Sequence, residues 1–381
     1  MKTAIIHDWL ISMGGAEKVL KAIHDLYPSK IYTLIKDSSK LKHTVFFDKE
    51  IESSFIQSLP MATKWYRNYL PFFSIAIEQF NLTDYDLILS SSHAVAKGVL
   101  THTSQLHICY CHTPMRYAWD LYPLYMEPLK GIKKIMAQLA LHGIRKWDIA
   151  SAHRVDHFIA NSYYVAQRIE KIYRRPAHVI YPPVDIDSFY IADQKEEYFI
   201  ACSRMVPYKK MDMIARAFQS MPDKKLILVG DGPQMSAIKK WASPNIEILG
   251  FVSDETLKTL LSKAKAMVFA ADEDFGIVMI EALASGTPVI ALGKGSACEI
   301  IDHKKTGILY REQTIDSLIE AVESFEKTQH LFDPLYLKQY SARFSKQRFD
   351  KEFNSFVTEK YDAFINRSKS VQASLTPLYN E

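Results

Sequence analysis

The sequence has few of the features that mark secreted, membrane-spanning or nucleic-acid-binding chains. It holds four cysteines, none of them in a C-x-x-C pair, so neither a zinc ribbon nor a dithiol redox motif is expected. We expect the four thiols to be reduced, as in a cytosolic protein. No apolar run approaches the ~20 residues that cross a bilayer, and the apolar run after Met1 is too short for a secretory signal. The formal net charge is only +4, which gives no ground to expect nucleic acid as a partner.

What the sequence does contain is enough apolar material for two globular domains. Its 381 residues are 48% hydrophobic and 24% charged, and a length of this size suggests two domains. Short apolar runs alternate with helical patterns along most of the chain, which predicts parallel sheets with helices on both faces. Expected strands lie at residues 4–7, 31–35, 87–90, 108–110, 157–160, 178–181, 198–201, 225–229, 246–249, 266–269, 289–291 and 307–309.

Two adjacent prolines divide this alternation. Pro182 and Pro183 follow the sixth expected strand, and consecutive prolines break a helix and stiffen the chain. We therefore predict an N-terminal Rossmann-like domain over residues 1–182 and a second over residues 183–344. The last helix is expected at about residues 346–366. In doubly wound sheets ligands bind beyond the carboxyl ends of the strands, and the motifs below lie at such positions.

The first motif is the pair Gly14-Gly15, just after the first expected strand. Glycines before a helix allow backbone N–H groups to approach a phosphate or a sugar oxygen closely. An ordinary tight turn is an equally good interpretation of this pair.

The second motif places Arg204 and Lys209 after the first strand of the second half. Arginine offers a planar fork for phosphate oxygens and lysine a point charge. Cations are disfavoured at a helix N-terminus unless an anion binds there, so a phosphate site is preferred to a solvated basic turn.

The third motif is the most informative: Glu273 and Glu281 stand eight residues apart across an expected strand-to-helix turn. Gly276 frees backbone N–H groups in the turn, and Ile277 is expected to begin the helix. One carboxylate can hold sugar hydroxyls and the other ribose hydroxyls. A surface loop followed by a glutamate on a helix face is the structural alternative.

Three further patterns are weaker. His112, at the carboxyl end of an expected strand, could donate a hydrogen bond, act in proton transfer or merely cap the turn before Pro114. The Gly230-Asp-Gly232 turn favours a structural role. The loop from Gly293 to Cys298 resembles a dinucleotide fingerprint but follows the wrong strand and ends in cysteine, although it could still contact a donor. No metal site is expected, because in His153-x3-His157 an arginine replaces the glutamate of the zinc motif.

Residues 129–147 form a basic segment with five lysines and arginines and no acidic residue. Its apolar positions recur at roughly helical spacing. Such a helix suits the surface of an anionic membrane, although an ordinary amphipathic helix with a solvated basic face has the same pattern.

Taken together and in order, these motifs resemble glycosyltransferase family 4, whose members have the GT-B fold. The resemblance covers nearly the whole chain and rests on Gly14-Gly15, His112, Arg204 with Lys209, the glycines after residue 229, and Glu273-x7-Glu281. It implies two doubly wound α/β domains that face each other across a cleft, with a C-terminal segment, residues 345–381, that crosses back to the first domain. The segment Cys-His-Thr-Pro-Met-Arg-Tyr-Ala-Trp-Asp at residues 111–120, with Glu273-Asp-Phe-Gly-Ile, is also similar to bacterial mannosyltransferases of surface-polysaccharide and O-antigen assembly.

The resemblance implies a role for each matched residue. Arg204 and Lys209 would hold the donor pyrophosphate, and Glu281 the ribose. Glu273 would hold the transferred sugar together with the backbone of Phe275, Gly276 and Ile277. Further donor contacts would come from Gly14, Gly15 and Val252, with His112 near the anomeric carbon. Gly295-Ser296 departs from the Gly-Gly of many relatives.

The resemblance thus implies a retaining, metal-independent hexosyltransferase without a resident cofactor, which moves mannose from GDP-mannose to a glycan or lipid-linked glycan. Such an enzyme would be cytoplasmic, with possible peripheral contact at the inner membrane face. No second carboxylate is evident as a nucleophile, so we expect front-face transfer, with Arg204 and Lys209 stabilising the leaving phosphate. The alternatives are a UDP-sugar donor, a nucleotide-sugar epimerase, a non-catalytic sugar-nucleotide-binding module and, least favoured, a nicotinamide dehydrogenase.

Overall fold

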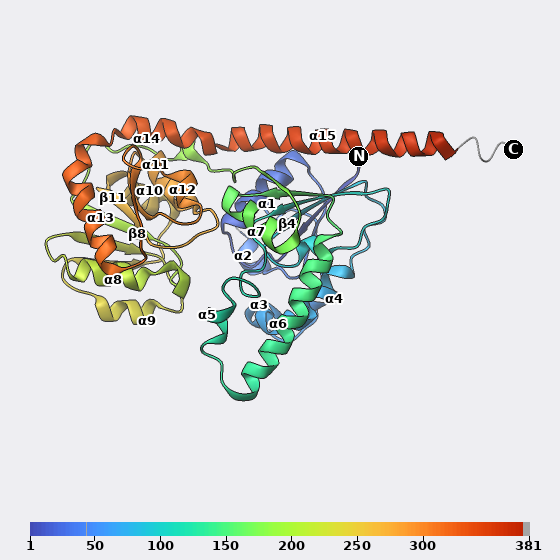
Figure 1. Cartoon of the computed structure of the whole chain (residues 1–381), viewed down its shortest axis with the longest axis horizontal. Coiled ribbons are helices and arrows are strands. Elements are labelled where there is room, and N and C mark those ends of the chain that lie inside the picture. Colours follow the sequence, from blue (N-terminus) through green and yellow to red (C-terminus); the bar gives the residue numbers. More distant parts are fainter. Residues whose placement is uncertain (43, 376–381) are drawn as a thin grey trace. The chain divides into compact units, whose positions relative to one another are not determined.

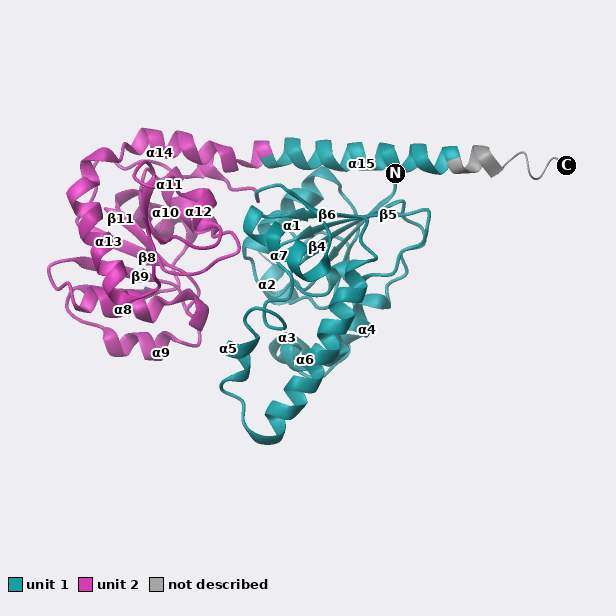
Figure 2. Ribbon diagram, viewed as in Figure 1, with its two compact units in different colours: residues 1–181, 349–381 teal, residues 182–348 magenta. Residues whose placement is uncertain are grey.

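The computed structural model describes residues 1–42 and 44–375, and the contacts divide the chain into two domains (Figure 2). The first domain comprises residues 1–181 and the segment from Phe349 onward, and the second comprises residues 182–348. The linker division lies one residue before the predicted one. The returning segment begins at Phe349, four residues after the predicted start at residue 345.

The first domain is built on a seven-stranded parallel sheet with the strand order β3-β2-β1-β4-β5-β6-β7. Six of its strands match expected ones. The edge strand β3 was not predicted, because it has only three residues, Ile-Glu-Ser, and carries no apolar run. The strands are β1 (Thr3–His7), β2 (Ile31–Thr33), β3 (Ile51–Ser53), β4 (Leu87–Ser92), β5 (Leu106–Cys111), β6 (His157–Ala160) and β7 (Ala177–Val179).

The second domain has a six-stranded parallel sheet with the order β10-β9-β8-β11-β12-β13. All six strands match the expected ones. Those in the middle of the sheet, β8, β11 and β12, are apolar and buried on both faces, as in parallel sheets generally, whereas the edge strand β10 is largely exposed. The strands are β8 (Tyr198–Cys202), β9 (Lys225–Val229), β10 (Ile246–Gly250), β11 (Ala266–Phe269), β12 (Val289–Leu292) and β13 (Gly307–Tyr310).

Helices cover both sheets (Figure 1). The first domain contributes α1 (Gly15–Leu26), α2 (Ser38–Leu41), α3 (Ala62–Trp65), α4 (Phe73–Glu78), α5 (Tyr122–Met126), α6 (Gly131–Ala152) and α7 (Tyr163–Tyr173), with 3₁₀ turns at Phe55–Ser58, Tyr66–Phe72 and Ala96–Gly98. The second contributes α8 (Met211–Gln219), α9 (Met235–Ile238), α10 (Asp254–Lys263), α11 (Ile277–Ala284), α12 (Ala297–Ile300), α13 (Ile315–Thr328) and α14 (Pro334–Ser341), with 3₁₀ turns at Ile186–Ser188, Pro207–Lys209, Lys239–Trp241, Gln329–Leu331 and Ala342–Phe344.

The last helix, α15 (Lys346–Leu375), begins in the second domain and continues in the first (Figures 1 and 2). It extends nine residues beyond the predicted end. Its side chains Phe349, Phe353 and Val357 are almost fully buried and pack with Ile5, Leu20 and other core residues of the first domain. The helix therefore completes a core that the first 181 residues leave open on one face.

Both sheets reverse their strand order at one place, between β1 and β4 and between β8 and β11. Ligands of doubly wound folds bind beyond the carboxyl ends of the strands at this point. The fold class is confirmed: each domain is a Rossmann-like parallel sheet, and the expected helix follows the second domain as α15.

Candidate active site

In the second domain, the loops after β8 and β11 meet at the reversal point of the sheet. Lys209, in the β8–α8 loop, forms a direct ion pair with Glu273, in the β11–α11 loop. The two side chains are only 14% and 13% exposed, and the Lys209 ammonium also lies 5.7 Å from the ring centroid of Phe269. Two residues predicted separately as donor contacts thus form one charged centre that is mostly shielded from solvent.

Arg204 stands in the same loop but is exposed. Its guanidinium donates a hydrogen bond to the hydroxyl of Tyr208 at 3.3 Å. Since the guanidinium remains accessible, it can approach an anion at the carboxyl end of β8 without first leaving a buried partner.

Helix α11 supplies the second carboxylate. Gly276 caps the helix with φ +81°, and its missing side chain makes room for Met279, whose methyl carbon would lie 2.6 Å from a Cβ. Glu281, in the second turn, is 7% exposed. Burial, followed by the nearby Glu281 carboxylate, raises the pKa of the Cys202 thiol to about 12, while Lys209 acts in the opposite direction. Glu281 and Lys209 thus share the environment at the end of β8.

The loop after β12 holds the Glu273 loop in place. Ser296 donates its hydroxyl to the carbonyl oxygens of Phe275 at 2.6 Å and Glu273 at 3.1 Å. Gly295 has φ +63°, and a Cβ there would lie 2.6 Å from the Glu273 carbonyl oxygen. The Gly295-Ser296 pair therefore holds in position the residues predicted to bind the sugar.

Close backbone contacts with the loop after β9 hold the Arg204 loop in position. Gly230 (φ +126°) and Gly232 (φ +157°) approach the backbone of Ser203 and Met205 so closely that side chains would overlap it, and the N–H of Met205 donates to the carbonyl of Asp231 at 2.9 Å. These contacts agree with the structural role expected for this turn.

Val252 lies between β10 and α10, two strands from β8 in the sheet order. It is half-buried, whereas Phe251 beside it is 85% exposed. The loop therefore presents apolar surface at the same edge of the sheet as the charged centre.

In the first domain, the carboxyl ends of β1, β4 and β5 assemble a buried polar cluster. His112 follows β5 and is 9% exposed, and its Nε2 lies 2.8 Å from the Ser91 hydroxyl. His7, at the end of β1 and fully buried, places Nδ1 3.1 Å from the Ser91 carbonyl oxygen. Burial, aided by His93 and His7, lowers the pKa of His112 well below its ordinary value, so the ring is neutral near pH 7.

Asp8 organises the turn after β4. Its carboxylate accepts four backbone N–H groups, those of residues 93–96, at 2.6–2.9 Å. This fully buried aspartate is therefore paired with the start of the 3₁₀ turn at Ala96–Gly98, and holds His93 beside the cluster.

Glu17 connects the glycine pair to the same cluster. Its carboxylate accepts the Gly14 N–H at 2.9 Å and lies 3.9 Å from Nε2 of His7. Burial raises the pKa of Glu17, but its electrostatic interaction with His7 outweighs this effect, so the net shift of the pKa is downward. Gly14 caps α1 with extended backbone, and Gly15 is the first residue of that helix. The pair thus forms the N-terminal cap of α1.

A second buried network fixes the loop after His112. Asp148 on α6 accepts hydrogen bonds from Trp119 at 2.7 Å and Tyr173 at 3.0 Å, and pairs with Lys97. Arg116 and Arg168 both reach Asp120, at 3.0 and 3.2 Å. The segment resembling mannosyltransferases is therefore anchored at its Trp-Asp end.

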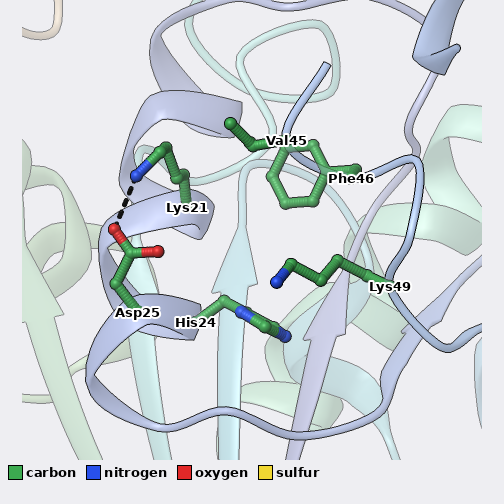
Figure 3. A pocket seen from close by; sticks show the side chains of 6 residues that line it. All are labelled: Lys21, His24, Asp25, Val45, Phe46 and Lys49. Atoms are coloured by element: carbon green, nitrogen blue, oxygen red, sulfur yellow. Dashed lines mark hydrogen bonds and ion pairs between the residues drawn. The ribbon is translucent and has the colours of Figure 1, made fainter. Parts of the chain in front are cut away.

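One pocket of about 300 Å³ lies elsewhere on the first domain, between α1 and the segment that contains Val45 and Phe46 (Figure 3). Its polar side chains are Lys21, His24, Asp25 and Lys49, with Lys21 and Asp25 paired at 2.6 Å. It shares no residue with either cluster.

Residues 1–42 and 44–375 contain no group of three or more histidine, cysteine, aspartate or glutamate side chains arranged to hold a metal ion. Nor does any helix in this part of the chain combine the length and apolar character needed to cross a membrane.

Sequence reasoning missed five members of the first-domain cluster: His7, Asp8, Glu17, Ser91 and His93. A signal was available for three of them, since His7-Asp8 ends the first expected strand and Ser91 extends the one beside it. The residues that join β1 to β4, however, lie 84 or more positions apart in sequence: His7 contacts Ser91, and Asp8 accepts the N–H of His93. Only the parallel register of β1 and β4 brings these residues together.

Two family models match the chain in succession. "Glycosyltransferase Family 4" matches residues 38–188 and "Glycosyl transferases group 1" matches residues 185–346. Together they cover most of the sequence, and the junction between them lies at the linker between the two domains.

Curated relatives are similar over part of their length. The GDP-mannose-dependent alpha-(1-6)-phosphatidylinositol monomannoside mannosyltransferase of Mycobacterium tuberculosis is 32% identical over 142 residues, 32% of this chain and 36% of the relative. The O-antigen chain mannosyltransferase RfbU of Salmonella typhimurium is 31% identical over 182 residues, 45% of this chain and 49% of the relative. The chain thus spans between a third and a half of these two proteins.

Among solved structures, HepE of Anabaena, determined in complex with UDP, is similar with a TM-score of 0.69 and 18% identity. The match covers 94% of this chain and all of the HepE chain. At this identity the likeness concerns the fold.

Proposed function

Because the chain belongs to the glycosyltransferases of the GT-B fold, with a family 4 domain followed by a group 1 domain, we propose that it transfers a hexose, with retention of configuration, from a nucleotide sugar to a glycan or lipid-linked glycan. The observation that carries this proposal is the Lys209–Glu273 centre at the carboxyl ends of β8 and β11. A cation there can neutralise a phosphate, and a carboxylate can bind sugar hydroxyls.

Each residue has a role in this reaction. Arg204 and Lys209 hold the pyrophosphate, Glu281 holds the ribose, and Val252 contacts the base. Glu273 and the backbone N–H groups of Phe275, Gly276 and Ile277 hold the hexose. In the first domain, His112 with Gly14 and Gly15 supplies hydrogen bonds to the sugar or phosphate.

The step proposed is front-face displacement. The bond between the anomeric carbon and the phosphate oxygen breaks, and the acceptor oxygen bonds to that carbon on the same face. The acceptor proton passes to the departing phosphate oxygen, while Arg204 and Lys209 stabilise the negative charge that develops on the phosphate. Because these side chains supply positive charge, the reaction needs neither a metal ion nor another cofactor, and it proceeds in EDTA.

GDP-mannose is the donor we favour. The support is the similarity to two relatives whose names specify mannosyl transfer, one of them with GDP-mannose. A UDP-sugar is the second candidate, favoured by the UDP complex of HepE. The two donors use the same fold and the same charged centre, so they differ at the base contact near Val252.

Calorimetric titration with GDP, UDP, ADP and NAD in EDTA tests the donor. We expect GDP to bind most tightly and Lys209→Ala to weaken that binding modestly. Preference for UDP would replace the mannose assignment and leave the reaction class intact. Preference for NAD, or no nucleotide binding, would contradict the proposal as a whole.

We also propose that α6 contacts an anionic membrane, which would carry a lipid-linked acceptor. Ile132, Ile135, Met136 and Leu139 share one helical face and are 52–69% exposed, which is unusual for a contiguous apolar stripe. The cations Lys130, Lys133 and Lys134, also exposed, lie beside them in the sequence, at the start of the helix. Apolar side chains flanked by lysines suit insertion at the headgroup level.

Co-sedimentation with vesicles tests this contact. Binding is expected to vesicles containing phosphatidylglycerol and to weaken with added salt. Replacing Ile135, Met136 and Leu139 with glutamine should abolish it, whereas Ile75→Gln, an exposed apolar residue on α4, is the control. Equal binding by the triple variant would refute this surface.

A further inference from the structure

The buried hydrogen bonds at the carboxyl ends of β1, β4 and β5 determine which nitrogen of His112 carries its proton. Three side chains form a continuous chain, His7, Ser91 and His112. His7 and Ser91 are completely buried and His112 nearly so, so these side chains rely mainly on one another for hydrogen bonds.

The first link is fixed by a carbonyl group. Nδ1 of His7 lies 3.1 Å from the Ser91 carbonyl oxygen, which can only accept, so Nδ1 carries a proton and donates it. The same nitrogen lies 3.2 Å from the Ser91 hydroxyl oxygen. That oxygen therefore faces a donor on its His7 side and cannot give its own proton to His7.

The second link follows from the first. The Ser91 hydroxyl makes its other hydrogen bond, at 2.8 Å, with Nε2 of His112, and within the described residues it has no further acceptor. If Nε2 carried a proton, the buried Ser91 hydroxyl would keep an unsatisfied hydrogen, which is unfavourable. Ser91 therefore donates, and Nε2 of His112 accepts.

We infer that Ser91 is a positioning residue that holds His112 as the neutral tautomer protonated at Nδ1, so that His112 serves as a hydrogen-bond donor to the transferred sugar. Nδ1 has no hydrogen-bond partner among residues 1–42 and 44–375 and remains available for a ligand. The tautomer follows from the geometry alone, whereas the contact with sugar rests on the function proposed above.

The chain provides a matched control one residue away. Ser90 is equally buried on β4, and its hydroxyl lies 2.8 Å from Nε2 of His107. Successive strand residues point to opposite faces of a sheet, so Ser90→Ala removes an equivalent buried serine–histidine bond outside the cluster of His112.

The test is a long-range ¹H–¹⁵N correlation spectrum of the ¹⁵N-labelled chain, with His112 identified by the signal lost in His112→Asn. We expect His112 to show protonated Nδ1 and unprotonated Nε2 in the wild type and in Ser90→Ala. Ser91→Ala should lose that pattern, and Ser91→Thr, which keeps the hydroxyl, should restore it. Protonated Nε2 in the wild type would overturn the inference without any variant, as would an unchanged pattern in Ser91→Ala.

Kinetics separate this inference from the proposed function. With GDP-mannose, Ser91→Ala should lower kcat about tenfold, the factor for one neutral hydrogen bond, with a smaller change in KM. Ser90→Ala should leave both within about twofold of the wild type. If the tautomer is as inferred but Ser91→Ala retains full kcat, the donor role of His112 fails. If no sugar is transferred by any variant, the proposed function fails and the tautomer assignment stands.

Discussion

Lys209 and Glu273 form a largely buried ion pair at the carboxyl ends of two neighbouring strands, the position at which a doubly wound sheet binds its ligand. Each was predicted from its motif as a separate donor contact, and their pairing was not, because it depends on β8 and β11 being neighbours in the sheet. The same limit applies to His7 and Ser91, whose partners depend on the register of β1 and β4. Residue types and their positions after strands were predictable from sequence, whereas mutual partners required the sheet order.

Lys209→Ala is expected to lower kcat by about 10²–10³ and to weaken GDP binding by less than tenfold, because the ammonium stabilises charge that develops mainly in the transition state. Steady-state kinetics and calorimetry measure the two effects. Lys210→Ala, which removes the neighbouring charge, is the control and should keep most of the activity. Equal losses of binding and turnover in Lys209→Ala would refute this role.

The buried ring of His107 makes a prediction about pH. Burial lowers its pKa from 6.5 to about 4, so between these values the unfolded chain binds the proton more readily than the folded one. Stability should therefore fall as the pH drops below 6.5, by about 2 kcal/mol at pH 5 from this residue alone. Thermal unfolding from pH 7.5 to 5 should show a shallower acid decline in His107→Gln than in the wild type, and an unchanged decline in the exposed-residue control His142→Gln. An equal decline in all three would contradict the assignment.

At the scale of elements, short loops between regular strands and helices form the candidate site. Most strands were predictable because their side chains form apolar runs. The start of α11 was predictable because Gly276 precedes the helix and Glu281 follows within it. The edge strand β3 was missed. The bracing of the Glu273 loop by Gly295 and Ser296 was missed as well, since it joins two loops that are more than twenty residues apart.

Gly295→Ala tests that brace. A Cβ would lie 2.6 Å from the Glu273 carbonyl oxygen, so the loop must move, and a displacement of about 1 Å at a reacting group can cost about 10²-fold in turnover. Gly131→Ala is the matched control: Gly131 also has positive φ, +56°, but a Cβ there meets nothing within 4 Å. It should lose about 1 kcal/mol of stability from backbone strain and no turnover. Full activity in Gly295→Ala, measured against folded protein, would contradict the brace.

At the scale of the whole molecule, the chain leaves its first domain at residue 181 and returns to it at Phe349. The Pro182-Pro183 break made the first crossing predictable. The residue at which the chain returns to the first domain was harder to predict, because α15 continues through this boundary without interruption. Only the burial of its phenylalanines in the first-domain core shows where it becomes part of that domain.

Phe353→Ala should lower the stability of the first domain by about 3–5 kcal/mol, since it removes a fully buried ring. Lys351→Ala, on the exposed face of the same helix, should change stability by less than about 0.5 kcal/mol. Thermal unfolding measures both, and GDP binding below the transition should persist in Phe353→Ala, because the residues proposed to hold the pyrophosphate, the ribose and the base belong to the second domain. Similar stabilities for the two variants would show that α15 contributes little to the first-domain core.

The reaction proposed for the whole molecule is metal-independent transfer of a hexose from a nucleotide sugar with retention of configuration. Proton NMR of GDP-mannose turnover in EDTA, with water as the acceptor, tests it most directly. We expect the first mannose released to be the α-anomer, before mutarotation mixes the two forms, and Lys209→Ala to slow its release. First appearance of the β-anomer would contradict retention, and turnover that requires added Mg²⁺ would contradict the charge-stabilising role of Arg204 and Lys209.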